Sequence, residues 1–306
     1  MTSHRSAEEV VAGIDLRGKT ILVTGVSSGL GVETARVLAS AGATVVGAAR
    51  DVEKAREALA GVKIEIGALD LASLASVREF AAWFSARHER LNVLVNNAGV
   101  MACPLGRTAD GFELQFGTNH LGHFMLTGLL APLLIAGAPS RVVSVSSGGH
   151  RIAGVDLDDA NFERSDYNPW LAYGRAKSAN ALFAVELDRR LRARGVRANA
   201  VHPGIIMTAL GRHLTAETLK EMTDRATSAG PMKWKPVSHG AATQVWAAVS
   251  PELDGVGGRY LEDVQIAEPM RAATDASGVA AHAVDPKIAA QLWSLSEKLV
   301  GQAFDL

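Results

Sequence analysis

The sequence predicts an α/β fold, namely a doubly wound, mostly parallel seven-stranded sheet with helices on both faces. Short runs rich in β-branched residues alternate with longer helix-like segments along the chain. These runs are apolar without strict alternation, which is typical of parallel strands covered on both faces. The strand–helix–strand order repeats, and such units take right-handed crossovers.

The elements follow one another in this order from residue 20 to the C-terminal end. The expected strands are 20–24, 44–48, 63–68, 92–95, 141–146, 197–201 and 259–261. The expected helices are 29–41, 51–60, 73–88, 111–136, 170–194, 236–249 and 285–301. No repeat or low-complexity linker divides the chain, so residues 18–306 are expected to form one domain. Residues 1–17 are expected to form a loosely attached tail.

Composition and charge argue against several classes of protein. The formal net charge of -1 gives no electrostatic basis for a nucleic-acid partner. The single cysteine, Cys103, excludes an intramolecular disulfide and suits a reducing compartment. The first ten residues lack the apolar core of a signal peptide, and the uncharged stretch 124–140 is too short to span a bilayer comfortably. We therefore expect a cytoplasmic protein without membrane insertion.

Two segments, 205–235 and 262–284, interrupt the alternation of elements. Both follow strand-like runs, where doubly wound sheets bind their ligands. We interpret them as substrate loops, with ordinary long loops as the alternative. The first segment predicts an apolar, medium-sized substrate because it contains Met207, Met222, Met232 and Trp234.

A glycine-rich turn joins the first expected strand to the first long helix. Gly25 permits a tight turn, Gly29 lets the backbone approach a pyrophosphate, and Gly31 lets the helix pack close to the sheet. Free N–H groups at the start of the helix then face the anion. This context predicts a Rossmann-type dinucleotide-binding domain, although the spacing G-x-x-x-G-x-G differs from the best-known fingerprint.

The end of the second expected strand bears on the choice of dinucleotide. An acidic residue there holds the ribose 2′-hydroxyl of NAD, whereas an arginine accommodates the 2′-phosphate of NADP. Arg50 follows the strand tip at Ala49, so NADP(H) is favoured and NAD(H) is the alternative. Asp51 is interpreted as a helix N-cap. Asp70, after the third strand, could either contact the adenine or cap the next helix.

Tyr173 and Lys177 are four residues apart in a helical pattern and therefore share a face. A phenol with a pKa of about 10 is a poor base at neutral pH. A nearby ammonium and an oxidised nicotinamide ring would both lower that pKa. The pair would then serve as a general acid/base.

Ser147 and Asn119 are two further candidates. Ser147 ends the fifth expected strand, where its hydroxyl could bind a substrate oxygen or simply satisfy backbone groups. Asn119 lies inside an expected helix, where asparagine is unfavourable, and a kink there would free a carbonyl for a proton-relay water. His120 and His123 have no acidic or thiol partners nearby in the sequence, so we expect no metal site.

Two short motifs follow the fourth and sixth expected strands. Residues 96–99 form an Asn-Asn-Ala-Gly run, in which small side chains leave room for a ribose and an amide can join adjacent strands. Residues 203–208 begin with Pro-Gly and end at Thr208. The backbone and the hydroxyl of this second motif could hold a nicotinamide carboxamide.

Together, in this order, these motifs resemble the short-chain dehydrogenase/reductase family over about residues 18–261. The resemblance implies an NAD(P)-dependent oxidoreductase that interconverts an alcohol and a ketone or aldehyde. The catalytic residues that it implies are Asn119, Ser147, Tyr173 and Lys177. The cofactor-binding residues expected from the motifs and the resemblance are Gly25, Ser27, Ser28, Gly29, Leu30, Gly31, Arg50, Asp70, Leu71, Asn97, Ala98, Gly99, Tyr173, Lys177, Pro203, Gly204, Ile206 and Thr208.

Finer features are similar to the retinol-dehydrogenase-like and WW-domain-oxidoreductase-like branch. They are residues 119–124, residues 146–150 and the insert 155–170 before Tyr173. That branch often carries a membrane anchor or an extra module, neither of which is expected here, and its substrate loops vary, so retinoid use is not implied. In the family two long helices, here 111–136 and 170–194, commonly pair across a two-fold axis, which makes a homodimer or homotetramer an option.

Two other functions are alternatives to this one. One is a catalytically silent NADP-sensing regulatory protein, which has no chemical need for Tyr173, Lys177 and Ser147 together. The other is a sugar-nucleotide epimerase or dehydratase. Such enzymes have a different glycine spacing and a larger C-terminal substrate domain, for which few residues remain.

Overall fold

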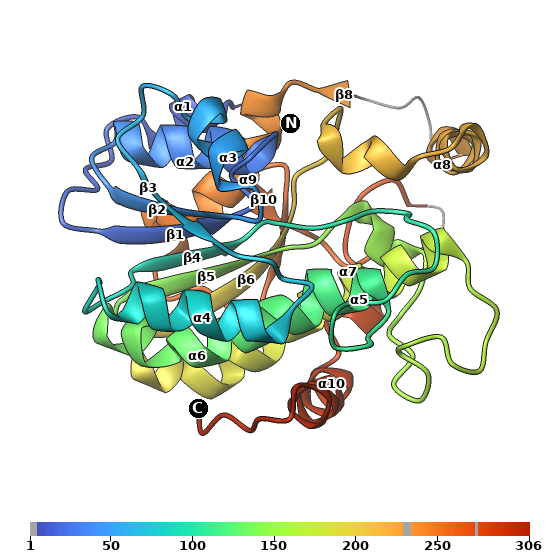
Figure 1. The fold of residues 1–306 in the computed structure, drawn as a ribbon. Helices are drawn as coiled ribbons and strands as arrows, with labels where there is room; N and C mark the ends of the chain where they lie inside the picture. The colour runs from blue at the N-terminus through green and yellow to red at the C-terminus, as the bar shows by residue number, and fades with distance from the viewer. Residues whose placement is uncertain (1–4, 229–233, 273–274) are drawn as a thin grey trace.

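The structure is a computed structural model that describes residues 5–228, 234–272 and 275–306, without the side chains of His213, Met222 and 224–228. Its eight-stranded sheet has the order β10-β9-β6-β5-β4-β1-β2-β3 (Figure 1). The strands are β1 (Thr20–Thr24), β2 (Thr44–Ala49), β3 (Glu65–Ala68), β4 (Val93–Asn96), β5 (Ser140–Val145), β6 (Val196–His202), β9 (Tyr260–Glu262) and β10 (Gln265–Ile266).

The predicted doubly wound α/β fold is confirmed, with one strand more than the seven expected. The seven predicted strands pair in parallel, and the additional strand β10 lies antiparallel to β9 at the edge. A run of two residues has too little pattern to predict a strand, so only pairing with β9 reveals β10. The strand order reverses between β1 and β4, where open α/β sheets bind their ligands.

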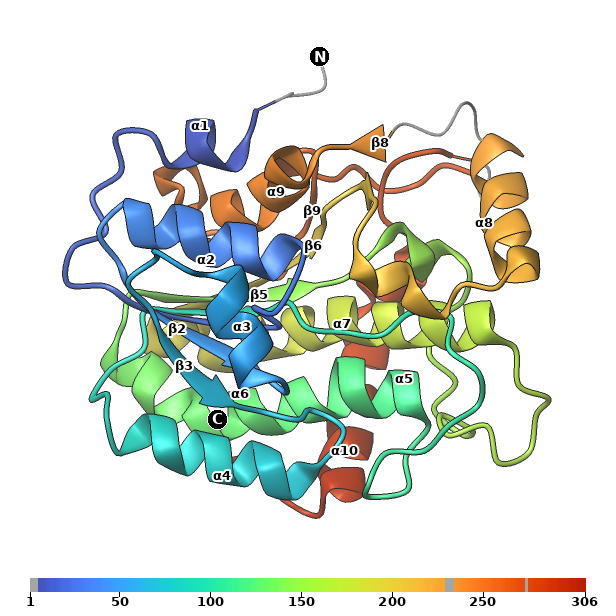
Figure 2. The same cartoon turned by 45° about the horizontal axis from the view of Figure 1, so that its top comes forward.

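Helices cover both faces of the sheet (Figures 1 and 2). On one face lie α4 (Leu74–Ser85), α6 (Gly122–Ala136), α7 (Pro169–Leu191) and α10 (Pro286–Val300), which share one apolar core. The other core lies beneath α1 (Ala7–Val11), α2 (Leu30–Ser40), α3 (Val52–Ala58) and α9 (Val237–Val249). The remaining α-helices are the short α5 (Leu114–Phe116) and α8 (Ala216–Ser228).

The expectation of a loosely attached tail over residues 1–17 is wrong for the part that the structure describes. Helix α1 begins after Ser6, whose side chain accepts a hydrogen bond from the Glu9 backbone. Ala7, Val10 and Val11 are buried, and α1 packs against α2 and α9. The apolar face of one short helix turn is sufficient to attach this segment, while residues 1–4 lie outside the described residues.

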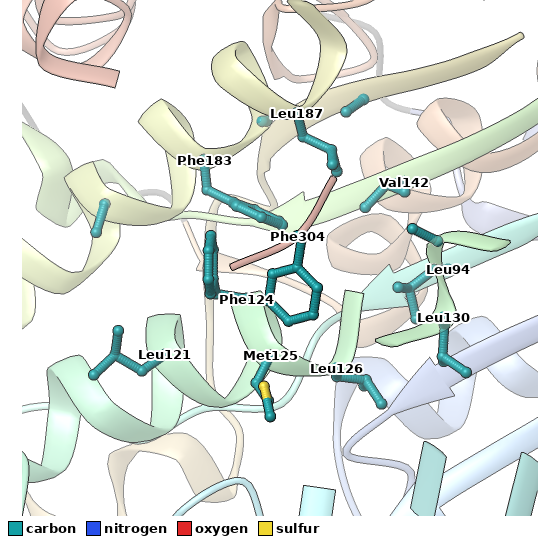
Figure 3. Packing of buried hydrophobic residues seen from close by; sticks show 14 of the residues in the cluster. Leu94, Leu121, Phe124, Met125, Leu126, Leu130, Val142, Phe183, Leu187 and Phe304 are labelled. Atoms are coloured by element: carbon teal, nitrogen blue, oxygen red, sulfur yellow. The ribbon is translucent and has the colours of Figure 1, made fainter. Parts of the chain in front are cut away.

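The apolar stretch 125–135 belongs to the core. Phe124 on α6 packs against Phe183 on α7 and against Phe304 near the C-terminal end (Figure 3). Trp293 of α10 covers both helices, with its ring 4.8 Å from that of Phe124. The helical run Leu114–Ala136 is long and apolar enough to cross a membrane, but 72% of its most apolar window is buried in the fold. Helix α10 packs against α7, and its Trp293 packs against Phe124 of α6. A homodimer or homotetramer remains a prediction.

The segment 205–235 is not one long loop. It forms the strand β7 (Ile205–Ile206), a 3-10 turn (Ala209–His213), α8 and the strand β8 (Trp234–Lys235), which pairs with β7. Of its methionines, Met232 lies outside the described residues, as does the Met222 side chain. The other predicted loop, 262–284, begins at the last residue of β9 and contains β10. Its Glu262 side chain and its Gly278 carbonyl both bind Arg151, which lies just beyond β5.

Candidate active site

The glycine turn after β1 depends on close approaches that exclude larger side chains. Gly25 has a φ of 77°, and a Cβ on it would lie 2.9 Å from the Cα of Ala98. A Cβ on Gly31 would lie 2.2 Å from the Gly25 carbonyl oxygen. Helix α2 follows Gly29 without a side-chain cap, so its first N–H groups can bind an anion. Ser27, Ser28 and Leu30 are partly exposed in the same turn, which therefore fits a dinucleotide pyrophosphate.

Side chains tie the ends of β1 and β4 together at this turn. The Asn97 amide donates to the Thr24 carbonyl at 2.8 Å. The Thr24 hydroxyl accepts from the backbone N–H groups of Asn97 and Ala98, each at 3.0 Å. Residues of the glycine turn and of the Asn-Asn-Ala-Gly run therefore lie side by side.

The segment after β6 reaches the same place. A Cβ on Gly29 would lie 3.1 Å from the Cβ of Thr208. Leu30 and Ile206 both lie against Gly240 at the start of α9. Pro203 is buried and Gly204 has a φ of 100°, which turns the chain from β6 into β7. The structure thus brings the Pro-Gly motif beside the glycine turn.

Arg50 and Asp51 differ in the partners that they have. Arg50 is exposed just after β2, and within the described ranges its guanidinium makes no hydrogen bond or ion pair. Asp51 is the N-cap of α3, because its side chain accepts from the Lys54 backbone. The structure therefore leaves the arginine free for a ligand and commits the neighbouring carboxylate to a helix.

Asp70 and Leu71 shape the turn after β3. The Asp70 carboxylate accepts from the Ala72 backbone at 2.9 Å. The cap of α4 is Ser73, so capping does not require Asp70. Leu71 is buried, and its carbonyl lies 2.4 Å from the position of a Cβ on Gly122. This turn is thereby held against the start of α6.

Tyr173 lies on the second turn of α7, with 3% of its surface exposed. Burial raises the pKa of its phenol to about 12, although a hydrogen bond with Ser147 acts in the opposite direction. A Cβ on Gly149 would lie 2.8 Å from the Tyr173 ring, so this glycine gives the ring its space. Gly149 belongs to the run 146–150, but the sequence alone assigns it no role in the site, although its place two residues after Ser147 is a usable signal.

Lys177 lies one turn further along α7, and its ammonium is 5.8 Å from the centre of the Tyr173 ring. Its Nζ donates to the Val145 carbonyl at 2.9 Å, and the Asn180 amide donates to the same oxygen. Burial lowers the pKa of Lys177 to about 8. The predicted shared face is present, but the protein groups alone do not lower the pKa of Tyr173, because burial outweighs the hydrogen bond with Ser147.

Asn119 lies in a π-helical turn (Gly117–Leu121) between α5 and α6, at the position of the expected kink. Its side chain binds both backbone groups of Val100, at 2.8 and 2.9 Å. Its carbonyl accepts from the His123 ring at 3.0 Å. A Cβ on Gly99 would lie 2.9 Å from the Asn119 amide oxygen and 3.7 Å from Lys177 Nζ, so these three residues are neighbours.

His120 and His123 are buried and have structural partners. The His120 ring binds the Ser296 hydroxyl at 2.7 Å, and the His123 ring binds the Thr24 hydroxyl at 2.9 Å. Burial lowers their pKa values to about 3 and 4. Within the described part of the chain, no three ligand-type side chains come together around one point.

Ser147 follows β5 in an extended conformation, and its hydroxyl accepts from the Gly149 backbone at 3.1 Å. A Cβ on Gly149 would lie 2.8 Å from the Tyr173 ring and 3.6 Å from Ser147 Oγ, so the two side chains are neighbours. The resulting arrangement can bind an oxygen by two hydroxyls and transfer one proton.

An apolar wall adjoins this pair of hydroxyls. Ala102, Trp170 and Tyr173 form a buried cluster, against which Met101, Ile152 and Leu214 pack. The Trp170 indole donates to the Thr218 carbonyl, which joins α8 to the start of α7. The sequence alone assigns no role in the site to Trp170 or Met101, although the first lies one turn before Tyr173 and the second just after the Asn-Asn-Ala-Gly run.

Comparisons with known proteins agree with this arrangement. The sequence profile described as short chain dehydrogenase matches residues 19–219. Short-chain dehydrogenase/reductase prx1 of Penicillium roqueforti is 44% identical over 94% of this chain and 86% of its own length. Retinol dehydrogenase 13 of Homo sapiens is 42% identical over 93% of this chain and 85% of its own length.

Solved structures give the same result. A protein from Mycobacterium paratuberculosis is similar with a TM-score of 0.74 and 38% identity, over 97% of this chain and 98% of the other. The Pseudomonas aeruginosa RhlG/NADP active-site complex is similar with a TM-score of 0.64 and 26% identity, over 81% and 95%. The chain therefore belongs to the short-chain dehydrogenase/reductase family, in its retinol-dehydrogenase-like branch, and is an NAD(P)-dependent oxidoreductase.

Proposed function

We propose that this enzyme uses NADP(H) to interconvert an apolar alcohol and its ketone or aldehyde, with Tyr173 as the general acid/base. One observation carries the proposal. Tyr173 and Ser147 lie against the same glycine, Gly149, beside Lys177 and Asn119 at the carboxyl edge of the sheet, where the glycine turn also ends.

The side chains have separate roles in this proposal. The bound dinucleotide supplies or accepts the hydride. Ser147 and Tyr173 bind the substrate oxygen, and Tyr173 Oη gives it a proton during reduction. Lys177 keeps N–H groups besides the one bound to Val145 and can hold the ribose, while its charge favours the phenolate. The Asn119 carbonyl has a second lone pair for a water that returns the proton.

The preference for NADP(H) rests on charge at the end of β2. Arg50 is exposed and unpaired among the described residues, so it can bind a 2′-phosphate with paired hydrogen bonds. Asp51 is occupied as the cap of α3 and is not available to hold a ribose hydroxyl. The RhlG complex with NADP shows that a relative of similar fold uses this cofactor.

The apolar wall supports an apolar substrate. Trp170 and Tyr173 belong to one buried cluster, against which Met101 and Leu214 pack, and Leu214 comes from the segment 205–235. This segment therefore closes one side of the substrate site in our proposal, as the sequence predicts. We also propose a small-molecule substrate, a cytoplasmic location, which the single cysteine suits, and no nucleic-acid partner, since the net charge is -1.

Loss of the reduced-nicotinamide absorbance with a panel of apolar aldehydes and ketones tests the proposal. Wild type should turn over members of the panel, and Tyr173→Phe should lower kcat by about 10²- to 10⁴-fold without weakening NADPH binding. Undiminished activity of Tyr173→Phe would refute the assignment. A wild type that binds NADPH but turns over no member of the panel would favour the silent NADP-sensing protein instead.

A further inference from the structure

His150 lies outside the residues to which the proposed chemistry assigns a role, yet it contacts the backbone of Ser147. Its side chain is fully buried just beyond β5, in the 3-10 turn Gly148–Arg151. The ring lies between the Ser147 carbonyl and the Ala280 backbone N–H, at 2.7 and 3.2 Å. It therefore joins the serine to a segment that is 130 residues away in sequence.

These two contacts determine the tautomer of the His150 ring. A backbone N–H can only donate, so Nε2 must accept from Ala280. Nδ1 then carries the ring proton and donates it to the Ser147 carbonyl. Burial lowers the pKa of His150 to about 4, which agrees with a neutral ring at neutral pH.

Tyr260 of β9 adds a third donor to the same carbonyl, which also accepts from the His150 backbone N–H at 3.1 Å. Its hydroxyl lies 3.0 Å from the Ser147 oxygen, and its ring centre lies 4.6 Å from that of His150. Its oxygen is also 2.9 Å from Nδ1, so the ring proton can be shared between the two oxygens. His150 and Tyr260 thus hold the carbonyl of the peptide that follows Ser147, and the His202 ring accepts from the N–H of the same peptide at 3.1 Å.

This peptide determines where the Ser147 hydroxyl points. The Ser147 backbone is extended, with φ -165° and ψ 161°, and the hydroxyl accepts from the Gly149 N–H within the turn that the peptide begins. Rotation of the peptide would move both Ser147 Oγ and Gly149, and Gly149 lies against the Tyr173 ring. The orientation of the two reacting hydroxyls therefore depends on the Ser147 carbonyl.

The segment after β10 holds His150 in turn. The His150 carbonyl lies within hydrogen-bond distance of the Ser178 hydroxyl, at 3.1 Å, and of the His282 ring, at 2.9 Å. The neighbouring Arg151 pairs with Glu262, which is 5% exposed. Ala280 and His282 of this segment therefore hold His150 by its ring and by its carbonyl.

We propose that His150 is a positioning residue for Ser147, and that Tyr260 and the Ala280 backbone hold its ring in the one tautomer that donates to the Ser147 carbonyl. The inference rests on the proposed function, because it assigns His150 an effect on turnover through Ser147. It predicts a loss in kcat and no loss in cofactor affinity, since none of these contacts involves the glycine turn.

A pair of substitutions at His150 tests this role. His150→Asn keeps an amide donor near the place of Nδ1, whereas His150→Gln moves the donor further along the side chain. We expect His150→Gln to lower kcat about tenfold, as the loss of a well-formed hydrogen bond would. His150→Asn should recover most of that loss, and the Kd for NADPH should stay within about twofold of wild type in both. His88→Asn is the control, because His88 follows the C-terminal end of α4 at the opposite edge of the sheet.

The decisive measurement repeats the substitutions in a Ser147→Ala background. If His150 acts through Ser147, His150→Gln should have no further effect on kcat there. Losses that multiply in the double variant, or equal losses for Asn and Gln with weaker NADPH binding, would overturn the proposal. Tyr260→Phe repeats the test if His150→Gln fails to fold, with an expected kcat loss of about three- to fivefold. Wild-type inactivity on the carbonyl panel would refute the proposed function itself, which is a different result.

Discussion

The Lys177 ammonium lies 5.8 Å from the centre of the Tyr173 ring, and both side chains are buried. Burial disfavours the charged form of each, so it lowers the pKa of Lys177 to about 8 and raises that of Tyr173 to about 12. In the protein alone at neutral pH, Tyr173 is therefore protonated and ready to donate, and Lys177 is mostly charged.

The buried charge of Lys177 should cost stability at neutral pH. Its pKa of about 8 in the folded chain lies below its ordinary value of 10.5, so the unfolded chain binds the proton more tightly. The contribution of Lys177 to the free energy of unfolding should therefore rise between pH 8 and 10.5. Lys177→Met should add up to about 3 kcal/mol at neutral pH and remove this rise.

Urea unfolding of cofactor-free protein across this pH range measures the effect. Lys63→Met is the matched control, because Lys63 is exposed and should leave both the stability and its pH profile unchanged. A Lys177→Met variant that keeps the wild-type pH profile would show that the ammonium is not desolvated in solution.

Arg50→Asp should reverse the choice of cofactor. A carboxylate at this tip repels the 2′-phosphate of NADP and can accept from the 2′-hydroxyl of NAD. We expect NADP affinity to fall about 10- to 100-fold. Thermal shifts with each dinucleotide report the change, and Arg56→Asp on α3 controls for the altered charge. Equal shifts of the wild type with NADP and NAD would contradict the proposed preference.

Gly149→Ala should impair turnover without weakening cofactor binding. The new Cβ would lie 2.8 Å from two atoms of the Tyr173 ring, so the ring must move away from Ser147. A displacement of this kind should lower kcat at least about tenfold. Gly148→Ala is the neighbouring control, because the atoms nearest to its Cβ belong to the His202 ring, at 3.3 Å, and to the Arg151 guanidinium, at 3.8 Å. Identical kcat values for the two variants would argue against a tight fit at Gly149.

Trp293→Ala should destabilise the fold, because this ring joins α10 to two core helices. The Trp293 ring stacks on the Phe183 ring with centroids 6.0 Å apart, and the Arg190 guanidinium lies 4.5 Å from the centre of the Trp293 ring. Truncating such a buried ring typically costs about 3–5 kcal/mol. Chemical denaturation measures the loss, with the exposed Lys298→Ala as control. A change below about 0.5 kcal/mol would mean that α10 is dispensable for the fold.

Much of the fold could be predicted because its signals are local. Apolar runs of strand length, helical periodicity and the glycines after β1 each act over a few residues. The shared face of Tyr173 and Lys177 follows from helix geometry alone. For the same reason the sequence predicted Ser147 at the end of a strand, where the structure has it. The sequence also predicted a kink at Asn119, and the structure has a π-helical turn there.

Tertiary structure alone decided what depends on contacts between distant segments. The sequence could not show that α1 packs on α9, that α10 covers α6 and α7, or that Tyr260 and Ala280 reach the backbone beside Ser147. Nor could it show that burial raises the pKa of Tyr173, since desolvation depends on everything packed around the ring. Residue order determines which groups are available and how they face locally, whereas long-range contacts set their exposure, and with it their chemistry.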